Sequence, residues 1–341
     1  MTLSERIFIL STLGDRLTGY IQKGELESLF GQMKNQNAWF TEDFVKKSVQ
    51  SIADNFLTES KLKSFASNYA IGGSSTAKVV GVIAAGNIPA VSFHDILCVF
   101  LSGNRTLLKT SSTDSVLIQF LINQLYAIDE RSKEFIEIGQ RLNQVEALIA
   151  TGSDNTAKHF EYYFSKVPHI IRRNRTSIAV LNGEENRIDL GNLGNDIFSY
   201  FGLGCRNVSK IFVPKGYDFI PFFESIEYWN TILLHHKYNN NYDYNKSIYL
   251  VNQDKHFDNG FLLLKESQDL VSPLGVVFYE EYDSVQSLQE TLQNNANKIQ
   301  AIVGSTGKVE REIPFGEAQT PSLNQFADEV DTMQFLTNIK K

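Results

Sequence analysis

The sequence predicts an α/β protein with two parallel-sheet domains and a helical N-terminal segment. A continuous apolar run at residues 79–85 leads into a Gly-Asn-Ile-Pro turn at 86–89, as expected for a buried parallel strand that ends in a loop. The order strand, turn, helix then recurs at residues 106–127 and 147–164. This recurrence is typical of a parallel sheet covered by helices on both faces.

The N-terminal segment, residues 1–70, has the spacing of amphipathic helices. An apolar stripe runs from Val45 to Phe56, and Thr41 precedes it in the position of an N-cap. These features indicate packing rather than chemistry. Further along the chain, residues 238–245 are rich in Asn and Tyr, and we expect them to form a solvated loop.

A second α/β unit is predicted after about residue 178. Its expected strands are the apolar runs at residues 177–181, 210–213, 275–279 and 299–304. We therefore divide the chain into three ranges, which are 1–178, 179–308 and 309–341. The last range is expected to return to the first domain or to a subunit interface.

Three loops of the first domain follow predicted strands, and ligands of open parallel sheets bind beyond such strand ends. Asn87 offers a side-chain amide to a developing oxyanion. Lys109 is placed to bond a ribose or a phosphate, and Thr151-Gly152-Ser153 begins a helix whose N–H groups favour an anion. Each motif also has an ordinary interpretation, as a turn, a solvated lysine or a common helix start.

Cys205 follows Gly202-Leu203-Gly204 and precedes an apolar run. Glycines permit close approach to the sulfur, and the neighbouring Arg206 favours the thiolate, which is the reactive form. The same local sequence equally fits an inert, buried thiol. Cys98, in contrast, lies within the apolar run 96–101 with no adjacent charge, so we predict that it belongs to the core.

Composition excludes several classes of protein. Two cysteines in 341 residues form no disulfide framework, which indicates a reducing compartment and hence the cytoplasm. A net charge of -7 argues against nucleic acid as a partner. The N-terminus lacks the features of a secretion signal and the apolar window at 79–91 is too short to span a bilayer, so we expect no membrane insertion. The histidines show no ligand spacing, and we expect no metal.

Taken in order, these motifs resemble the aldehyde dehydrogenase superfamily and, within it, the bacterial acyl-CoA reductases related to the fatty acid reductase of luminous bacteria. The resemblance covers about residues 78–336. The Asn87 loop is similar to the oxyanion loop, the Lys109 strand to the one that contacts the adenosine ribose, and Gly202 to Val213 to the nucleophile segment. The run at 314–323 resembles the reductase branch.

The resemblance implies roles for these residues. Cys205 would be the nucleophile, and Asn87 and the Cys205 backbone N–H would bind the oxyanion. The range 1–178 would bind a nicotinamide cofactor, NADPH with NADH as the alternative, and 179–308 would carry the cysteine. Cofactor-binding residues would be Lys109, Thr151, Gly152, Ser153 and Asp269. Asp269 comes from a segment at 269–273 that only echoes the superfamily's Glu-x-Phe-Gly-Pro motif.

Two departures from the superfamily matter. Members that oxidise aldehydes use a glutamate to activate water, but the matching stretch here, residues 170–177, contains three arginines and no carboxylate. Without that base, a thioester on Cys205 would accept a hydride or exchange with a thiol rather than meet water, as an acyl-CoA reductase requires. In addition, Leu203 replaces the usual glutamine of the nucleophile loop.

The arginines of this stretch, Arg172, Arg173 and Arg175, are candidates for binding the phosphates of NADP or CoA, although a solvated edge is an equal alternative. The expected function is therefore NADPH-dependent reduction of an acyl-CoA, or of an acyl carrier, to an aldehyde. Two alternatives remain open: an acyl-phosphate reductase of the same superfamily and a non-catalytic binding protein that retains the fold. Because superfamily members are usually dimers or tetramers, the resemblance also implies a homo-oligomer.

Overall fold

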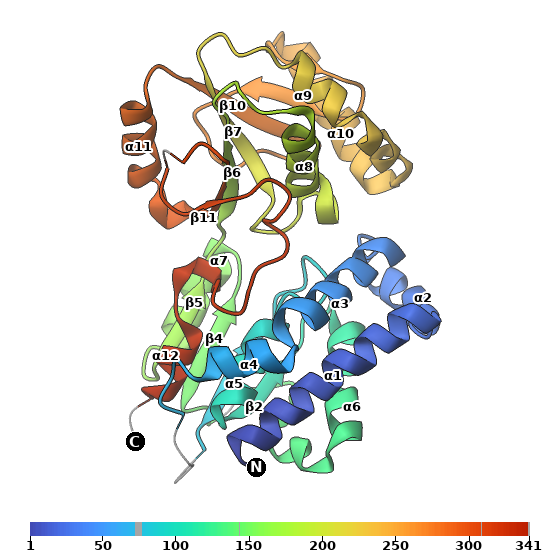
Figure 1. Ribbon diagram of the computed structural model, residues 1–341, viewed down its shortest axis with the longest axis vertical. Helices are drawn as coiled ribbons and strands as arrows, with labels where there is room; N and C mark the ends of the chain where they lie inside the picture. Colours follow the sequence, from blue (N-terminus) through green and yellow to red (C-terminus); the bar gives the residue numbers. More distant parts are fainter. Residues whose placement is uncertain (72–76, 143, 308, 340–341) are drawn as a thin grey trace. The chain divides into compact units, whose positions relative to one another are not determined.

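The computed structural model describes residues 1–71, 77–142, 144–307 and 309–339. They form two compact units, one of Met1–Asn174 with Pro321–Lys341 and one of Arg175–Thr320 (Figure 1). The sequence placed the domain limits at 178 and 308, and residue 308 itself lies outside the described residues, as do residues 340 and 341 of the expected C-terminal range. The C-terminal helix α12 (Thr332–Thr337) packs against α5 (Phe93–Ser102) within the first unit.

The first unit contains a five-stranded parallel sheet in the order β3-β2-β1-β4-β5. Its strands are β1 (Val79–Ile83), β2 (Arg105–Lys109), β3 (Ile136–Ile138), β4 (Ala147–Thr151) and β5 (His169–Arg172). The connecting helices are α5, α6 (Ser115–Ile128), η1 (Glu130–Glu134) and α7 (Asp154–Tyr163). The strand order reverses between β1 and β4, and ligands of doubly wound sheets bind beyond the strand ends at such a point.

Four helices precede this sheet, and they bury their apolar faces in the core of the first unit. They are α1 (Leu3–Lys23), α2 (Glu27–Gln36), α3 (Glu42–Phe56) and α4 (Glu59–Ala66). Thr41 caps α3 as expected, because its Oγ1 accepts a hydrogen bond of 3.4 Å from the Phe44 N–H. Cys98 is fully buried in this core, which confirms its predicted place. A short 3₁₀ turn, η5 (Ala327–Glu329), precedes α12.

The second unit contains a seven-stranded sheet in the order β12-β11-β6-β7-β10-β9-β8, parallel except for the β8–β9 pair. Its strands are β6 (Thr176–Val180), β7 (Val208–Pro214), β8 (Phe257–Asp258), β9 (Leu263–Glu266), β10 (Val276–Tyr282), β11 (Ile299–Val303) and β12 (Glu312–Ile313). Its helices are α8 (Arg187–Phe198), η2 (Ser199–Gly202), α9 (Ile220–Ser225), η3 (Glu227–Leu234), α10 (His236–Asn252), α11 (Val285–Asn294) and η4 (Ala296–Lys298).

The loop predicted at residues 238–245 is wrong, because this segment lies within α10. Tyr238, Tyr242 and Tyr249 are buried from one face of that helix. The Tyr238 hydroxyl donates a hydrogen bond of 3.0 Å to the Phe261 carbonyl. Aromatic packing and this bond outweigh the low helix propensity of the asparagines, since tertiary contacts routinely override propensity.

None of the described helices combines the length and the apolar character that a membrane span requires. Within the described ranges, no three side chains of His, Cys, Asp or Glu gather in a way that would hold a metal ion.

Candidate active site

Asn87 lies in the loop between β1 and α5, at the carboxyl end of the sheet, with an exposed side chain. Hydrogen bonds hold the loop on both sides of this residue. The Gly86 carbonyl accepts one of 2.9 Å from Thr113 Oγ1, and the Pro89 carbonyl accepts one of 2.6 Å from Ser48 Oγ. The backbone that presents the Asn87 amide is therefore fixed by side chains from other elements.

Gly86 is the residue that allows this close packing. A Cβ at this position would lie 2.5 Å from both Ser111 Oγ and Thr113 Oγ1, which is closer than real Cβ contacts come. The two hydroxyl oxygens also lie 2.9 Å apart and form a hydrogen bond. Any side chain at residue 86 would thus displace the turn after β2 or the Asn87 loop.

Asp114 is a buried carboxyl group that the sequence analysis missed. Its side chain is 1% exposed, and its Oδ2 accepts a hydrogen bond of 2.8 Å from the N–H of Ala90, a residue in the left-handed region at φ 54°. Among the residues that the structure describes, the Oδ1 atom has no hydrogen-bond partner. Burial raises the pKa of Asp114 to about 8, against a smaller lowering by the Ala90 N–H. A nearly neutral acid therefore supports the far end of the Asn87 loop.

Lys109 and the turn at 151–153 follow the two strands that flank β1. In the register of the sheet, Ile83 at the end of β1 lies opposite Lys109 on one side and Ala150 on the other. Lys109 is exposed at the end of β2. The structure thus brings the three loops predicted from sequence to one edge of the sheet, where its strand order reverses.

Ser153 is the N-cap of α7, as the sequence predicted for this turn. Its Oγ accepts a hydrogen bond of 3.4 Å from the Thr156 N–H. Gly152 packs against the same residue, since a Cβ there would lie 3.1 Å from Thr156 Cβ. Helix N-termini of this kind favour anions, because the macrodipole and the first N–H groups point toward them.

The three arginines proposed for phosphate binding each bind a different partner within their own unit. Arg172 is buried, and its guanidinium binds Asp95 through two nitrogens at 2.5 and 2.9 Å and Thr332 Oγ1 at 2.9 Å. Arg173 pairs with Glu161 at 2.6 Å. Arg175, in the second unit, donates to the Ile299 carbonyl at 3.2 Å. We do not carry Arg172 into the proposed site, because its outer nitrogens already serve the core of the first unit.

Cys205 lies in the turn that joins η2 to β7, and its side chain is partly exposed. Its carbonyl accepts a hydrogen bond of 3.0 Å from the buried Ser177 Oγ. Burial lowers the pKa of the neighbouring Arg206, while electrostatic attraction to Cys205 acts in the opposite direction. Arg206 is thus a cation that interacts electrostatically with Cys205, and a neighbouring cation is a general feature of reactive cysteines.

Within the run at 314–323 that resembled the reductase branch, Gly316 and Ala318 bond to α8, the helix that precedes η2 and the Cys205 turn. The carboxylate of Asp196, fully buried near the end of α8, accepts hydrogen bonds from the N–H of Gly316 at 2.6 Å and of Ala318 at 3.0 Å. This run therefore ties the carboxyl end of α8 in place. Asp196 is another residue that the sequence analysis did not single out.

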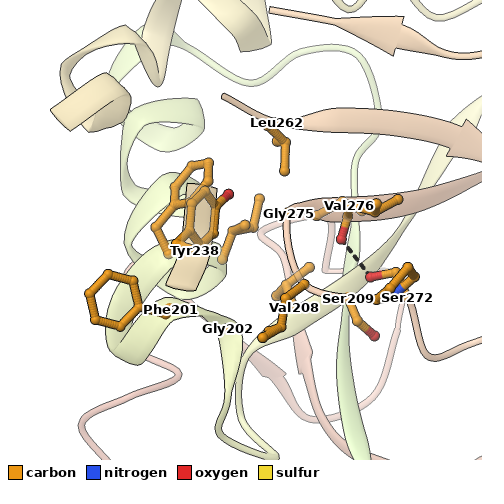
Figure 2. Close-up of a pocket in the computed structure, with 14 residues that line it drawn as sticks. Phe201, Gly202, Val208, Ser209, Tyr238, Leu262, Ser272, Gly275 and Val276 are labelled. Carbon is orange, nitrogen blue, oxygen red and sulfur yellow. Dashed lines mark hydrogen bonds between the residues drawn. The ribbon is translucent and has the colours of Figure 1, made fainter. Parts of the chain in front are cut away.

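Figure 2 shows a small cavity beside η2, lined by Phe201, Gly202, Tyr238 and the loop before β10. Its volume is about 30 Å³, which is room for about one water molecule. Ser272 in that loop donates a hydrogen bond of 2.6 Å to the Val276 carbonyl. Asp269 precedes it and is exposed.

Comparison with known proteins finds one family match. Residues 29–159 match the model of the family described as acyl-CoA reductase (LuxC), a range that includes Asn87 and Lys109 but not Cys205. No curated protein sequence matches the chain.

Solved structures that resemble the chain include aldehyde dehydrogenases. Aldehyde dehydrogenase 21 from Physcomitrella patens has a TM-score of 0.70 at 12% identity, over 99% of this chain and 84% of that one. An NAD-dependent aldehyde dehydrogenase from Sinorhizobium meliloti has a TM-score of 0.67 at 10% identity, over 92% and 74%. An NAD-dependent benzaldehyde dehydrogenase from Corynebacterium glutamicum has a TM-score of 0.64 at 10% identity, over 94% and 83%. The chain therefore has an aldehyde dehydrogenase fold, and its residues 29–159 match the acyl-CoA reductase (LuxC) family model; together these findings indicate an oxidoreductase.

Proposed function

We propose that the protein reduces an acyl-CoA, with a fatty acyl group, to the aldehyde through a thioester on Cys205. The observation that carries the proposal is the partly exposed Cys205 on a hydrogen-bonded turn, followed in the sequence by Arg206, a cation with which it interacts electrostatically. A thiolate is the form that attacks a carbonyl carbon, and a neighbouring cation stabilises it.

The residues of the chain take the following parts in the reaction. The Cys205 thiolate attacks the thioester carbonyl, and the carbonyl oxygen accepts hydrogen bonds from the Asn87 amide and the Cys205 N–H as negative charge develops on it. The carbon–sulfur bond to CoA breaks and CoA leaves as its thiolate, which takes a proton from solvent. The acyl group then remains on Cys205.

A reduced nicotinamide, when bound, supplies the hydride that turns this thioester into an aldehyde and regenerates the cysteine. The first unit fits such a cofactor: α7 offers its N-terminus to a pyrophosphate, Gly152 permits close approach of the backbone, and exposed Lys109 is available to the ribose. We assign Thr151, Ser153 and, in the second unit, Asp269 to the same role, and we propose NADPH rather than NADH.

We infer reduction, rather than hydrolysis, of the acyl group on Cys205 because residues 170–177 contain no carboxylate. The described residues 170–177, which form β5 and the start of β6, supply no carboxylate that would activate water. The acyl group on Cys205 is thereby protected from general-base hydrolysis and stays available for reduction. The reaction that we propose runs toward the aldehyde, whereas two of the structural relatives are named as NAD-dependent dehydrogenases of aldehydes.

The test compares Cys205→Ser with Cys98→Ser, a matched control in which the other, buried thiol is changed. We expect Cys205→Ser to abolish NADPH oxidation in the presence of a fatty acyl-CoA, and Cys98→Ser to retain it. Mass spectrometry without NADPH should find an acyl adduct on Cys205. Full activity of Cys205→Ser would exclude the mechanism. Turnover of acyl phosphates but not of acyl-CoA would show that the substrate is an acyl phosphate instead of an acyl-CoA. Light scattering would test the expected homo-oligomer.

A further inference from the structure

The backbone of η2, which directly precedes the turn that carries Cys205, is strained. Tyr200 and Phe201 both lie in the left-handed region, at φ 53° and 59°, and Gly202 follows at φ 80°. A bulky residue rarely adopts this conformation, because its Cβ approaches the backbone carbonyl oxygen. Two aromatic residues in succession persist there only where surrounding contacts hold them.

Asn207 supplies such contacts from the other side of the turn. Its side chain is 2% exposed, and its Nδ2 donates to three carbonyls at the end of α8 and the start of η2, those of Asp196 at 3.0 Å, Ile197 at 3.2 Å and Ser199 at 2.8 Å. The last carbonyls of a helix have no helical N–H partner. One amide from beyond the cysteine therefore closes the end of α8.

The same side chain also fixes the residue directly before the cysteine. Asn207 Oδ1 accepts a hydrogen bond of 2.8 Å from the Gly204 N–H, and the Asn207 N–H donates one of 3.0 Å to the Gly204 carbonyl. Gly204 and Asn207 thus enclose Cys205 and Arg206 in a closed turn. The turn cannot relax without breaking these bonds.

Two charged residues, Arg206 and Asp196, belong to the surroundings of the turn. Arg206 is the cation that interacts with Cys205. The carboxylate of Asp196 accepts from two backbone N–H groups and so is directed toward the run at 314–320. A shift of the turn would change the separation of the Cys205 sulfur and the Arg206 guanidinium.

We propose that Asn207 is a positioning residue that holds the Cys205 thiol beside Arg206 by closing the strained turn between α8 and β7. The inference rests on the proposed role of Cys205 as nucleophile, and it adds to that role the device that keeps the sulfur in place. Asn207 acts through the backbone of its neighbours and does not touch the substrate.

The test uses the full chain and reads the thiol directly. Asn207→Asp keeps the size of the side chain but places an oxygen against the three carbonyls, and Asn207→Ser provides a second, smaller change. The rate of Cys205 alkylation by iodoacetamide is measured against pH by peptide mass spectrometry. We expect alkylation at neutral pH to slow about tenfold and its pH midpoint to rise by about one unit, because the thiolate fraction falls when the cation moves away.

Asn245→Asp is the matched control. Asn245 is a buried asparagine of α10 in the same unit, and its Nδ2 donates to the carbonyls of Asn241 at 2.8 Å and Leu274 at 3.1 Å. We expect this change to lower the melting temperature and to leave the pH midpoint of Cys205 unchanged. A wild-type midpoint in the folded Asn207 variants, or an equal shift in Asn245→Asp, would overturn the proposal. The readout needs no turnover, so a failure of the proposed reductase activity would be seen separately, in Cys205→Ser.

Discussion

Replacement of Asp114 by Asn tests whether a buried, largely neutral acid supports the Asn87 loop. Asparagine keeps the shape and an oxygen that accepts from the Ala90 N–H, but it does not ionise. The wild-type carboxyl has its pKa raised from 3.8 to about 8, mainly by burial. Because the folded protein binds this proton more tightly than the unfolded chain does, the stability contributed by the neutral acid is fully present below pH 3.8. It is lost as the pH rises through 8.

The magnitude follows from linkage. Between the two pKa values the folded state holds one proton more than the unfolded state at this group, so the free energy of unfolding falls by about 1.4 kcal/mol per pH unit. From pH 5 to pH 7 this amounts to about 2.7 kcal/mol. The variant lacks this pH-dependent contribution. Its amide N–H₂ takes the place of Oδ1, which has no hydrogen-bond partner among the described residues, and this unpaired amide costs about 1–3 kcal/mol at every pH.

The assay is urea unfolding of both proteins at several pH values between 5 and 9. All other groups titrate alike in the two proteins, so the difference in unfolding free energy isolates Asp114. We expect the unfolding free energy of the variant to rise relative to that of the wild type by about 1.4 kcal/mol per pH unit up to about pH 8, and this difference then to level off. Two curves that run parallel from pH 5 to pH 9 would show that Asp114 is ionised in the folded protein and would refute this reasoning.

Two further predictions concern the first unit. Asp95→Ala should lower the free energy of unfolding by about 3–5 kcal/mol, because it leaves the buried Arg172 charge unpaired. The control Glu161→Ala breaks an exposed ion pair and should lower this free energy by less than about 1 kcal/mol. Similar losses of unfolding free energy in the two chemical denaturation curves would contradict this prediction. Gly86→Ala should destabilise the protein by about 1–3 kcal/mol and reduce kcat, since the added Cβ would lie 2.5 Å from two hydroxyl oxygens. The control Gly31→Ala lies on α2, where a Cβ would contact none of the described residues, and should be neutral or stabilising by up to about 1 kcal/mol. A wild-type melting temperature and kcat for Gly86→Ala would contradict the packing argument.

Sequence alone located the strands that are continuous apolar runs. Residues 79–85, 147–150 and 299–304 each contain an observed strand, because buried parallel strands need apolar side chains on both faces. Strand β5 was missed, since Arg172 interrupts its apolar pattern. The charge is tolerated there because Asp95, which is distant in the sequence, neutralises it. The local sequence around residue 172 does not indicate that such a partner exists.

The candidate site divides in the same way. Asn87, Lys109 and Cys205 were predicted because each stands in a local motif beside a strand, and the order of the motifs carried the resemblance. The residues that hold them were not predicted. Asp114 and Asn207 act through backbone groups of other segments, and an Asp or Asn in a turn looks the same in a sequence whether or not it does so. Asp114 differs from an ordinary turn residue only by its burial, which is a property of the folded chain.

The order of segments along the chain has a consequence for synthesis. The first unit consists of two stretches separated by the whole of the second, and its later stretch supplies Thr332 to Arg172 and the Leu336 carbonyl to Asn104. A ribosome delivers the chain from its N-terminus, and domains generally fold as they emerge. The inserted unit is continuous and can be completed first, whereas its host waits for residues after 320. We therefore expect the nascent host to depend on chaperones for longer than the insert does.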